Sequence, residues 1–259
     1  MKTKATVNCL GYPVYAGELD NYDFSKKTYI NTINQYSYCI AEKDENFKKS
    51  LLSSDILLPD GVGITAASKF LNHMPIAKFS GSDLHGYLLK KMNKEGGRVF
   101  YLGSSNDVLA KIEERLSKEY PNIKVGSYSP PYKDEFSSAD NDSMINAVNA
   151  FEPDVLFVGM TAPKQEKWTN QNRKYLNANI VCAVGAVFDF YAGTVERPNE
   201  VWVNSGFEWL GRLVKEPKRM WKRYMYYGAV FAYYLLKEKA HQVTGFNTYE
   251  PEYEMSLNR

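Results

Sequence analysis

Short apolar runs, bounded by glycine, proline or polar turns, alternate along the chain with longer segments of helical periodicity. This pattern predicts strands at residues 27–34, 56–58, 98–102, 122–127, 154–158 and 180–187. It predicts helices at residues 44–54, 62–71, 108–119, 143–151 and 163–176. Apolar strands separated by helices of this length are typical of a parallel sheet covered by helices on both faces. We therefore predict an α/β fold.

The composition changes after about residue 200. Residues 205–241 are rich in Trp, Tyr, Lys and Arg, with Pro217 as the only strong breaker. We predict a catalytic sheet domain over residues 1–200 and a basic, aromatic, helical appendage over residues 201–259. The most apolar stretch, 225–236, is shorter than the roughly 20 residues of a membrane-spanning helix. The first residues carry charges without an apolar region behind them, so we expect no signal peptide.

Charge and reactive side chains narrow the class of function. The net charge of +2 argues against a dedicated nucleic-acid binder. Three cysteines lie far apart, without a CxxC pair, and the three histidines are equally dispersed. We therefore expect a reducing cytoplasmic environment and no metal site.

The strongest local charge bias lies in the appendage. Six basic residues and one acid, Glu216, occupy the segment from Arg212 to Arg223, and an aromatic run follows. Such segments lie on anionic membranes, with cations on phosphates and aromatic rings at the interface. The alternative is a helix packed on the sheet domain with a solvated basic face.

Parallel sheets bind ligands at the carboxyl ends of their strands, so polar turns there are the candidate sites. Asp60 leaves a strand in the turn Pro59-Asp60-Gly61-Val62-Gly63, where a carboxylate can act as a base. Its alternative role is the N-cap of the next helix. Thr32 and Asn34 end the preceding strand, and alternation places them on one face, toward the same crevice. Alternatively, they are ordinary polar residues at a strand end.

Two glycine-ended strands offer further polar turns. Gly103 and Ser104 can receive a phosphate on helix N–H groups, although the segment is neither a GxGxxG nor a Walker A loop, and capping is the alternative. After Gly159, Pro163 suits the first turn of a helix. Gln165 and Glu166 would then face the crevice, with groups suited to a base, ribose or sugar. Capping and solvated surface are their alternative roles.

Asp189 lies between two aromatic residues after the last predicted strand, an unusual place for a charge. It either binds a ligand or pairs with a base such as Arg197.

Taken in order, seven segments resemble the WecG/TagA/CpsF family of bacterial glycosyltransferases, and the likeness spans residues 30–224. The segments are TIN at 32–34, AEKDENFKKSLLSSDILLPDGVG at 41–63, SGSDL at 80–84, VFYLGSS at 99–105, PDVLFVGMTAPKQEKW at 153–168, GAVFDFYAGTVERP at 185–198 and FEWLGRLVKEPKRMWKRY at 207–224.

The resemblance implies a Rossmann-like core, an appendage that touches the membrane, and an inverting, metal-independent reaction without a cofactor. Members move a hexose or N-acetylhexosamine-type sugar from a UDP-sugar to a sugar on undecaprenyl pyrophosphate, in surface polysaccharide biosynthesis. We therefore expect a UDP-sugar, a lipid-linked acceptor and an anionic membrane surface as partners, and no nucleic acid. The expected location is cytoplasmic, on the inner face of the cell membrane. Homo-oligomer formation stays open.

The resemblance also assigns roles to residues of this sequence. Asp60 matches the catalytic base, with Thr32 and Asn34 in a Thr-x-Asn element near the acceptor sugar. The remaining matches are implied to bind substrate: Lys78 with the Gly-x-Asp element Gly81 and Asp83, the turns at Gly103, Ser104 and Gly159, the pair Gln165 and Glu166, the Phe-Asp residue Asp189, and the appendage arginines Arg212, Arg219 and Arg223.

The sequence departs from the family pattern in three places. Lys78 replaces an arginine, which keeps the charge but loses the bidentate fork. Thr161 replaces a glycine, and residues 17–27 are too short for the N-terminal helix of family members. Two other classes stay open: a dinucleotide enzyme, disfavoured by the missing GxGxxG, and a catalytically silent module that binds UDP-sugar or membrane.

Overall fold

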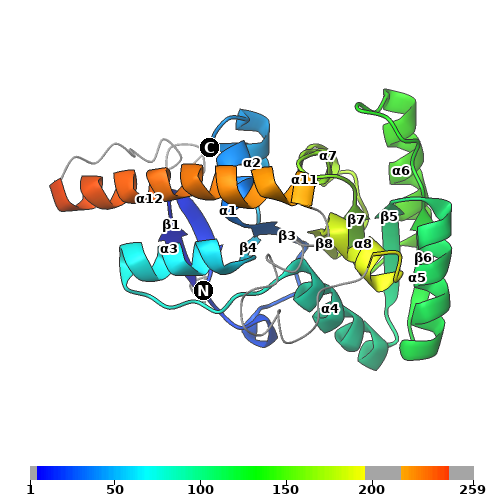
Figure 1. Cartoon of the computed structure of the whole chain (residues 1–259). Helices are drawn as coiled ribbons and strands as arrows, with labels where there is room; N and C mark the ends of the chain where they lie inside the picture. Colours follow the sequence, from blue (N-terminus) through cyan, green and yellow to red (C-terminus); the bar gives the residue numbers. More distant parts are fainter. Residues whose placement is uncertain (1–4, 196–216, 245–259) are drawn as a thin grey trace, which may run out of the picture.

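The computed structural model describes residues 5–195 and 217–244, and its centre is a six-stranded, fully parallel sheet (Figure 1). The strand order is β4-β3-β8-β7-β5-β6. The predicted α/β, Rossmann-like fold is confirmed. In chain order the strands are β3 (Thr28–Ile33), β4 (Ile56–Pro59), β5 (Arg98–Gly103), β6 (Lys124–Tyr128), β7 (Val155–Gly159) and β8 (Ile180–Ala183).

Helices cover both faces of this sheet, and a small hairpin precedes it. The helices are α1 (Gln35–Ala41), α2 (Glu45–Leu52), α3 (Val62–Asn72), α4 (Gly81–Glu95), α5 (Asn106–Glu119), α6 (Ser138–Phe151), α7 (Lys164–Asn172), α8 (Gly185–Tyr191), α11 (Pro217–Trp221) and α12 (Tyr227–Thr244). The π-helical turn η2 (Lys222–Tyr226) joins the last two. The antiparallel hairpin consists of β1 (Thr6–Cys9) and β2 (Tyr12–Tyr15), and the 3-10 turn η1 (Leu19–Asn21) follows it.

Strand alternation divides the buried side chains between two layers. Val99 and Tyr101 of β5 belong to a core that includes residues of α4, α5 and α8. Phe100 and Leu102, the alternate residues of the same strand, belong to a core with residues of α6 and α7. Because successive strand side chains point to opposite faces, a strand buried on both sides is apolar throughout. This is why the sequence pattern identified β5 and β7.

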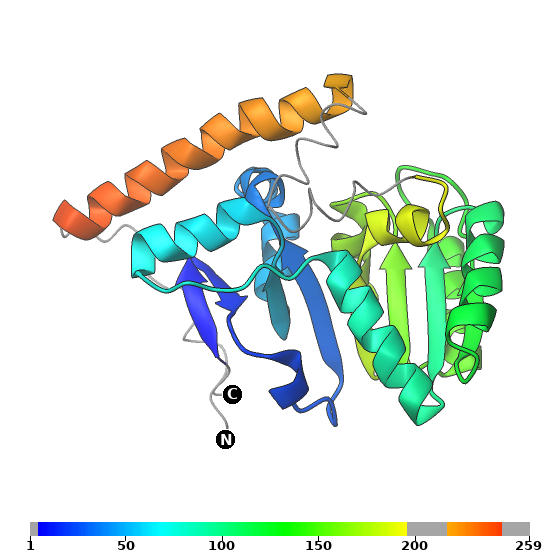
Figure 2. The ribbon, with the colours of Figure 1, turned by 60° about the horizontal axis from the view of Figure 1, so that its bottom comes forward.

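A third core attaches the C-terminal helix to the sheet domain. Tyr38 of α1 packs edge-on against Phe231 and Tyr234 of α12, with ring centroids 5.4 and 5.5 Å apart. Figure 2 shows α12 lying across α1 and α3, which it contacts. No helix in the described ranges combines the length and apolarity needed to cross a membrane. The predicted domain boundary at residue 200 lies outside the described residues.

The predicted strand at 180–187 is wrong in its second half. Strand β8 ends at Ala183, and α8 begins at Gly185. Both parts are apolar and buried, and a short apolar run does not distinguish a strand from a buried helix.

The sequence pattern also missed α1, α4 and the N-terminal hairpin. Helix α4 had a usable signal, because Ser80 and Asp83 form a reciprocal capping box at its start.

Candidate active site

The sheet reverses its winding between β5 and β7, and the ends of these two strands are in close contact. From β5 the chain continues outward to β6, whereas from β7 it continues inward to β8. Gly103 has a φ of +128°, and a Cβ there would lie 2.1 Å from the Gly159 carbonyl oxygen. The Ser104 N–H donates to that oxygen at 3.1 Å. These contacts restrict position 103 to glycine. They lie where the strand order reverses, which is where such sheets bind ligands.

The turn after β5 caps helix α5, which is one of the two roles predicted for it from the sequence. Ser105 is the N-cap of α5, and its side chain accepts from the Val108 N–H. The Ser104 carbonyl accepts a hydrogen bond of 2.7 Å from the Ser129 hydroxyl. A phosphate-binding role for Gly103 and Ser104 stays a prediction.

Gln165 and Glu166 lie in the first turn of α7 as predicted, but they are buried and do not line an open crevice. Each side chain is only 5% exposed. The Gln165 Oε1 accepts from the Met160 N–H at 3.1 Å, and its Nε2 donates to Glu166 Oε1 at 2.9 Å. Gln165 therefore ties the loop after β7 to the first turn of α7, and Glu166 in turn holds the Gln165 amide.

Burial has an electrostatic consequence for Glu166. Loss of water around the carboxyl raises its pKa to about 7, although the Gln165 hydrogen bond opposes the rise. Its second oxygen, Oε2, has no hydrogen-bond partner among the described residues.

At the carboxyl end of β3, Thr32 belongs to the strand, whereas Asn34 lies beyond it. Thr32 is half-buried near the end of β3 and pairs in register with Leu58. Strand β3 ends at Ile33, so Asn34 lies beyond the alternation that was expected to include it. The Asn34 side chain accepts from the backbone N–H groups of Tyr36 and Ser37, each at 3.0 Å. Asn34 is therefore the N-cap of α1.

Asp60 follows β4 directly and is half-buried. Its backbone N–H donates to the Ile33 carbonyl at 2.8 Å, which holds the turn against the end of β3. The N-cap of α3 is Gly61, with a φ of +93°, and not Asp60. The interpretation of Asp60 as a helix cap is therefore wrong.

The segment that leads into α4 lies at the same carboxyl end of the sheet. The Phe79 N–H donates to the Pro59 carbonyl at 2.9 Å, so the half-buried Lys78 belongs to a segment beside the Asp60 turn. Asp83 accepts from the Ser80 backbone and hydroxyl in the capping box. A Cβ on Gly81 would lie 3.3 Å from Val187 of α8. Lys78 is therefore held near Asp60, while Gly81 and Asp83 shape the helix start.

The last predicted site residues lie in α8 and the appendage. Asp189 is half-buried in α8, and the Thr194 hydroxyl donates to its Oδ1 at 3.4 Å. Arg197 and Arg212 lie outside the described residues, as does the side chain of Arg219. The Arg223 guanidinium lies 4.8 Å from the centre of the Tyr36 ring, in the first turn of α1. One appendage arginine thus reaches the first turn of α1, next to Asn34.

Comparison with known proteins identifies the family. The profile of the glycosyl transferase WecG/TagA/CpsF family matches residues 5–244. The chain belongs to this family.

Three curated relatives of the family come from Bacillus subtilis (strain 168), Bacillus spizizenii (strain W23) and Staphylococcus aureus (strain MW2). They are 30%, 31% and 26% identical to this chain over 228, 202 and 203 residues. The matches cover 88%, 78% and 78% of this chain, and 86%, 76% and 71% of the relatives. All three carry the name N-acetylglucosaminyldiphosphoundecaprenol N-acetyl-beta-D-mannosaminyltransferase.

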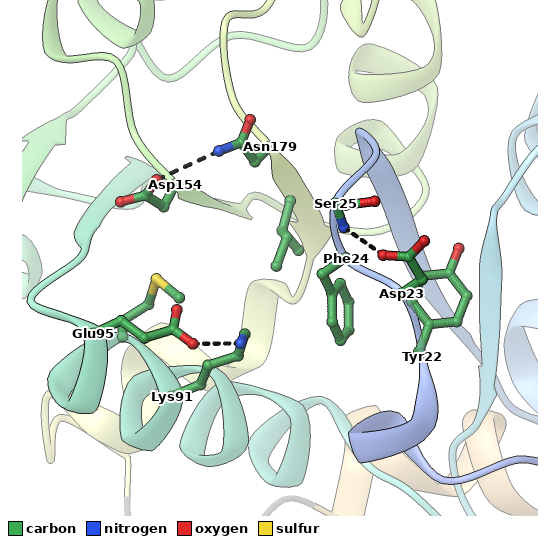
Figure 3. A pocket seen from close by; sticks show the side chains of 10 residues that line it. Tyr22, Asp23, Phe24, Ser25, Lys91, Glu95, Asp154 and Asn179 are labelled. Carbon is green, nitrogen blue, oxygen red and sulfur yellow. Dashed lines mark hydrogen bonds and ion pairs between the residues drawn. The ribbon is translucent and has the colours of Figure 1, made fainter.

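A polar cavity of about 350 Å³ lies at the opposite edge of the sheet (Figure 3). Asp154 and Asn179, which precede β7 and β8, line it together with the end of α4. Within it, Lys91 pairs with Glu95, and Asp154 accepts from the Arg98 N–H at 2.8 Å. Its polar groups thus bond one another or the adjacent backbone at the amino ends of the strands, opposite to the end that carries Asp60. Across the described ranges, no three His, Cys, Asp or Glu side chains gather to hold a metal ion.

The family motifs do not include Gln35, the first residue of α1. Its amide lies against the turn that carries Asp60, and its Oε1 is buried without a hydrogen-bond partner among the described residues. The sequence gives no periodicity or motif signal for this residue.

Proposed function

We propose that this protein is an inverting glycosyltransferase that moves a hexose or N-acetylhexosamine-type sugar from a UDP-sugar to a sugar on undecaprenyl pyrophosphate. The names of the relatives support a lipid-linked acceptor, because each describes transfer to N-acetylglucosaminyldiphosphoundecaprenol. The observation that carries the proposal is the Asp60 turn. This carboxylate follows β4 at the ligand-binding edge of the sheet and does not cap α3.

In the proposed reaction, Asp60 accepts the proton of an acceptor hydroxyl while that oxygen forms a bond to the anomeric carbon of the donor sugar. The bond from this carbon to the UDP oxygen breaks on the opposite face, so the configuration inverts and the electron pair leaves with UDP. Thr32 pairs with Leu58, two residues before Asp60. We assign Thr32 the task of positioning the acceptor hydroxyl.

The departing diphosphate gathers negative charge, which the protein has to stabilise. Lys78 belongs to the segment bonded to the Asp60 turn, and Arg223 lies over the Tyr36 ring of α1, so we assign both cations to this charge. Backbone N–H groups at the starts of α5 and α7, behind Gly103 and Gly159, supply further donors. Gln165 and Glu166 hold the second of these loops in place. Asp189, a carboxylate, is assigned to bind the UDP-sugar and not to stabilise this charge. In this proposal these groups suffice without a metal.

The appendage supports action at a membrane surface. Trp221, Tyr233 and Leu236 are more than 60% exposed, and Lys218 and Lys222 of the same appendage are exposed as well. Aromatic and aliphatic groups with flanking cations favour an anionic bilayer interface. We expect co-sedimentation with vesicles containing anionic lipid and little with zwitterionic vesicles. Transfer by a variant ending near residue 200 at the full-length rate would contradict a role for the appendage in the site.

The decisive assay is acceptor-dependent UDP release from a panel of UDP-sugars, with a short lipid-diphosphate-sugar acceptor and EDTA. The enzyme, Asp60→Asn and the exposed control Asp142→Asn are compared. Release that survives EDTA, collapses in Asp60→Asn and persists in the control supports a metal-independent transferase with Asp60 as base. Release unchanged in Asp60→Asn returns this residue to a structural role. UDP-sugar binding without turnover on any acceptor would favour a silent module, and tight NADH binding without UDP binding a dinucleotide enzyme.

A further inference from the structure

The side-chain amide of Gln35 lies beside the turn that carries Asp60, and no residue in the described part of the chain bonds its oxygen. Its Oε1 is shielded from solvent and has no partner in the described part of the chain. A Cβ built on Gly63 would lie 2.8 Å from this oxygen, and one built on Gly61 would lie 3.6 Å from it. The side chain therefore lies against the turn, and Gly63 leaves the space that it occupies, whereas a Cβ at position 61 would make only an ordinary contact with it.

Shielded oxygens without a donor are uncommon in native proteins, and each calls for an explanation. The neighbouring Asn34 needs none, because its side chain accepts from two backbone N–H groups of α1. Gln35 begins the same helix, yet no described residue bonds its amide. Its hydrogen-bonding capacity is thus unused within the described residues, at the carboxyl ends of β3 and β4.

The chemistry of the amide indicates what binds there. A neutral amide offers two donor hydrogens and one acceptor oxygen, which suits the hydroxyl and acetamido groups of a sugar. Phosphate groups instead favour cations such as arginine and lysine. A ligand at Gln35 is therefore expected to be the sugar part of a substrate rather than its diphosphate.

We propose that Gln35 is a specificity-determining residue that hydrogen-bonds the acceptor sugar next to its attacking hydroxyl. This inference rests on the proposed function, in which Asp60 takes the proton of that hydroxyl. The Asp60 N–H is bonded to Ile33, two residues before Gln35, so both side chains arise from one junction. The terminal torsion of glutamine is broad, so rotation can present either its oxygen or its NH2 group to a bound sugar.

The test uses Gln35→Met in the full-length chain, because methionine keeps the length and packing of the side chain without its hydrogen bonds. Gln171→Ala, on the exposed surface of α7, is the control. Initial rates are measured with short-chain lipid-diphosphate acceptors carrying N-acetylglucosamine or glucose, and UDP affinity is measured separately. We expect kcat/KM for the preferred acceptor to fall about threefold to tenfold, the preference between the acceptors to shrink, and UDP affinity to stay within twofold.

A structural role would give a different result. The unbound protein gains nothing from an unpartnered Oε1, so the denaturant midpoint of Gln35→Met should equal or exceed that of the wild type. Unchanged acceptor kinetics in Gln35→Met, beside an active wild type, would overturn the role of Gln35 and leave the transferase standing. Equal losses of acceptor turnover and UDP affinity, or a clear loss of stability, would likewise overturn it. Absence of transfer by the wild type to every acceptor would overturn the proposed function and this inference together.

Discussion

The buried carboxyl of Glu166 makes the stability of this protein depend on pH in a defined direction. Its pKa rises from 4.5 to about 7 on folding because burial disfavours the charged form. Below pH 4.5 the group is protonated in both the folded and unfolded states, and the free energy of unfolding is then highest with respect to this group. As the pH rises toward 7, the unfolded chain loses the proton first, and stability falls. Above pH 7 the loss is complete, at roughly 3 kcal/mol as an upper bound.

Glu166→Gln removes this titration but keeps a carbonyl oxygen that accepts from Gln165 Nε2. Denaturant unfolding at pH 5 and pH 8 should therefore show the variant gaining about 2.5 kcal/mol relative to the wild type between the two values. The exposed residue Glu135, changed to Gln, controls for removal of one carboxylate. A difference between Glu166→Gln and wild type that is the same at both pH values would refute a buried, neutral Glu166.

Three further variants test the geometry around the site. Gly103→Ala should lose more than about 2 kcal/mol of unfolding free energy in denaturant melts, because its Cβ would overlap the Gly159 carbonyl. A loss below about 0.5 kcal/mol would contradict that close approach. Asn34→Ala should lose about 1 kcal/mol in the same melts, and Asn34→Asp, which still accepts from the start of α1, should lose little. Phe231→Ala should remove about 3–5 kcal/mol of packing. In limited proteolysis, trypsin should then cleave faster at Lys237 and Lys239, and wild-type cleavage rates there would count against docking of α12 on Tyr38.

The sheet could be predicted because its strands are buried on both faces. Strand β7 is apolar throughout and β5 is apolar after Arg98 apart from the buried Tyr101 hydroxyl, and Gly103 and Gly159 mark their ends. Helix α8 could not be separated from β8, since both are apolar and buried. Hairpin β1–β2 has strands of only four residues, too short for a clear alternation, although its two-residue turn at Leu10 and Gly11 sets the register locally.

The candidate site was predictable only in part. Asp60 and Thr32 follow from strand ends, and the family resemblance adds Lys78, which the structure holds beside the Asp60 turn. The burial of Gln165 and Glu166 was not predictable, because a polar pair at a helix start usually faces solvent. Gln35 was missed because its setting depends on glycines 61 and 63, which are distant in sequence.

In the proposed function, the contacts of α1 couple the appendage, which is proposed to meet the membrane, to the residues proposed to hold the acceptor. One end of this helix begins at the Asn34 cap, while Tyr36 and Tyr38 contact Arg223, Tyr227 and Phe231 of the appendage. A lipid surface that favours the docked α12 should therefore also favour an ordered acceptor pocket. Thermodynamic reciprocity then requires the converse: a bound acceptor tightens attachment to the bilayer, so that the enzyme stays longest where its substrate is found.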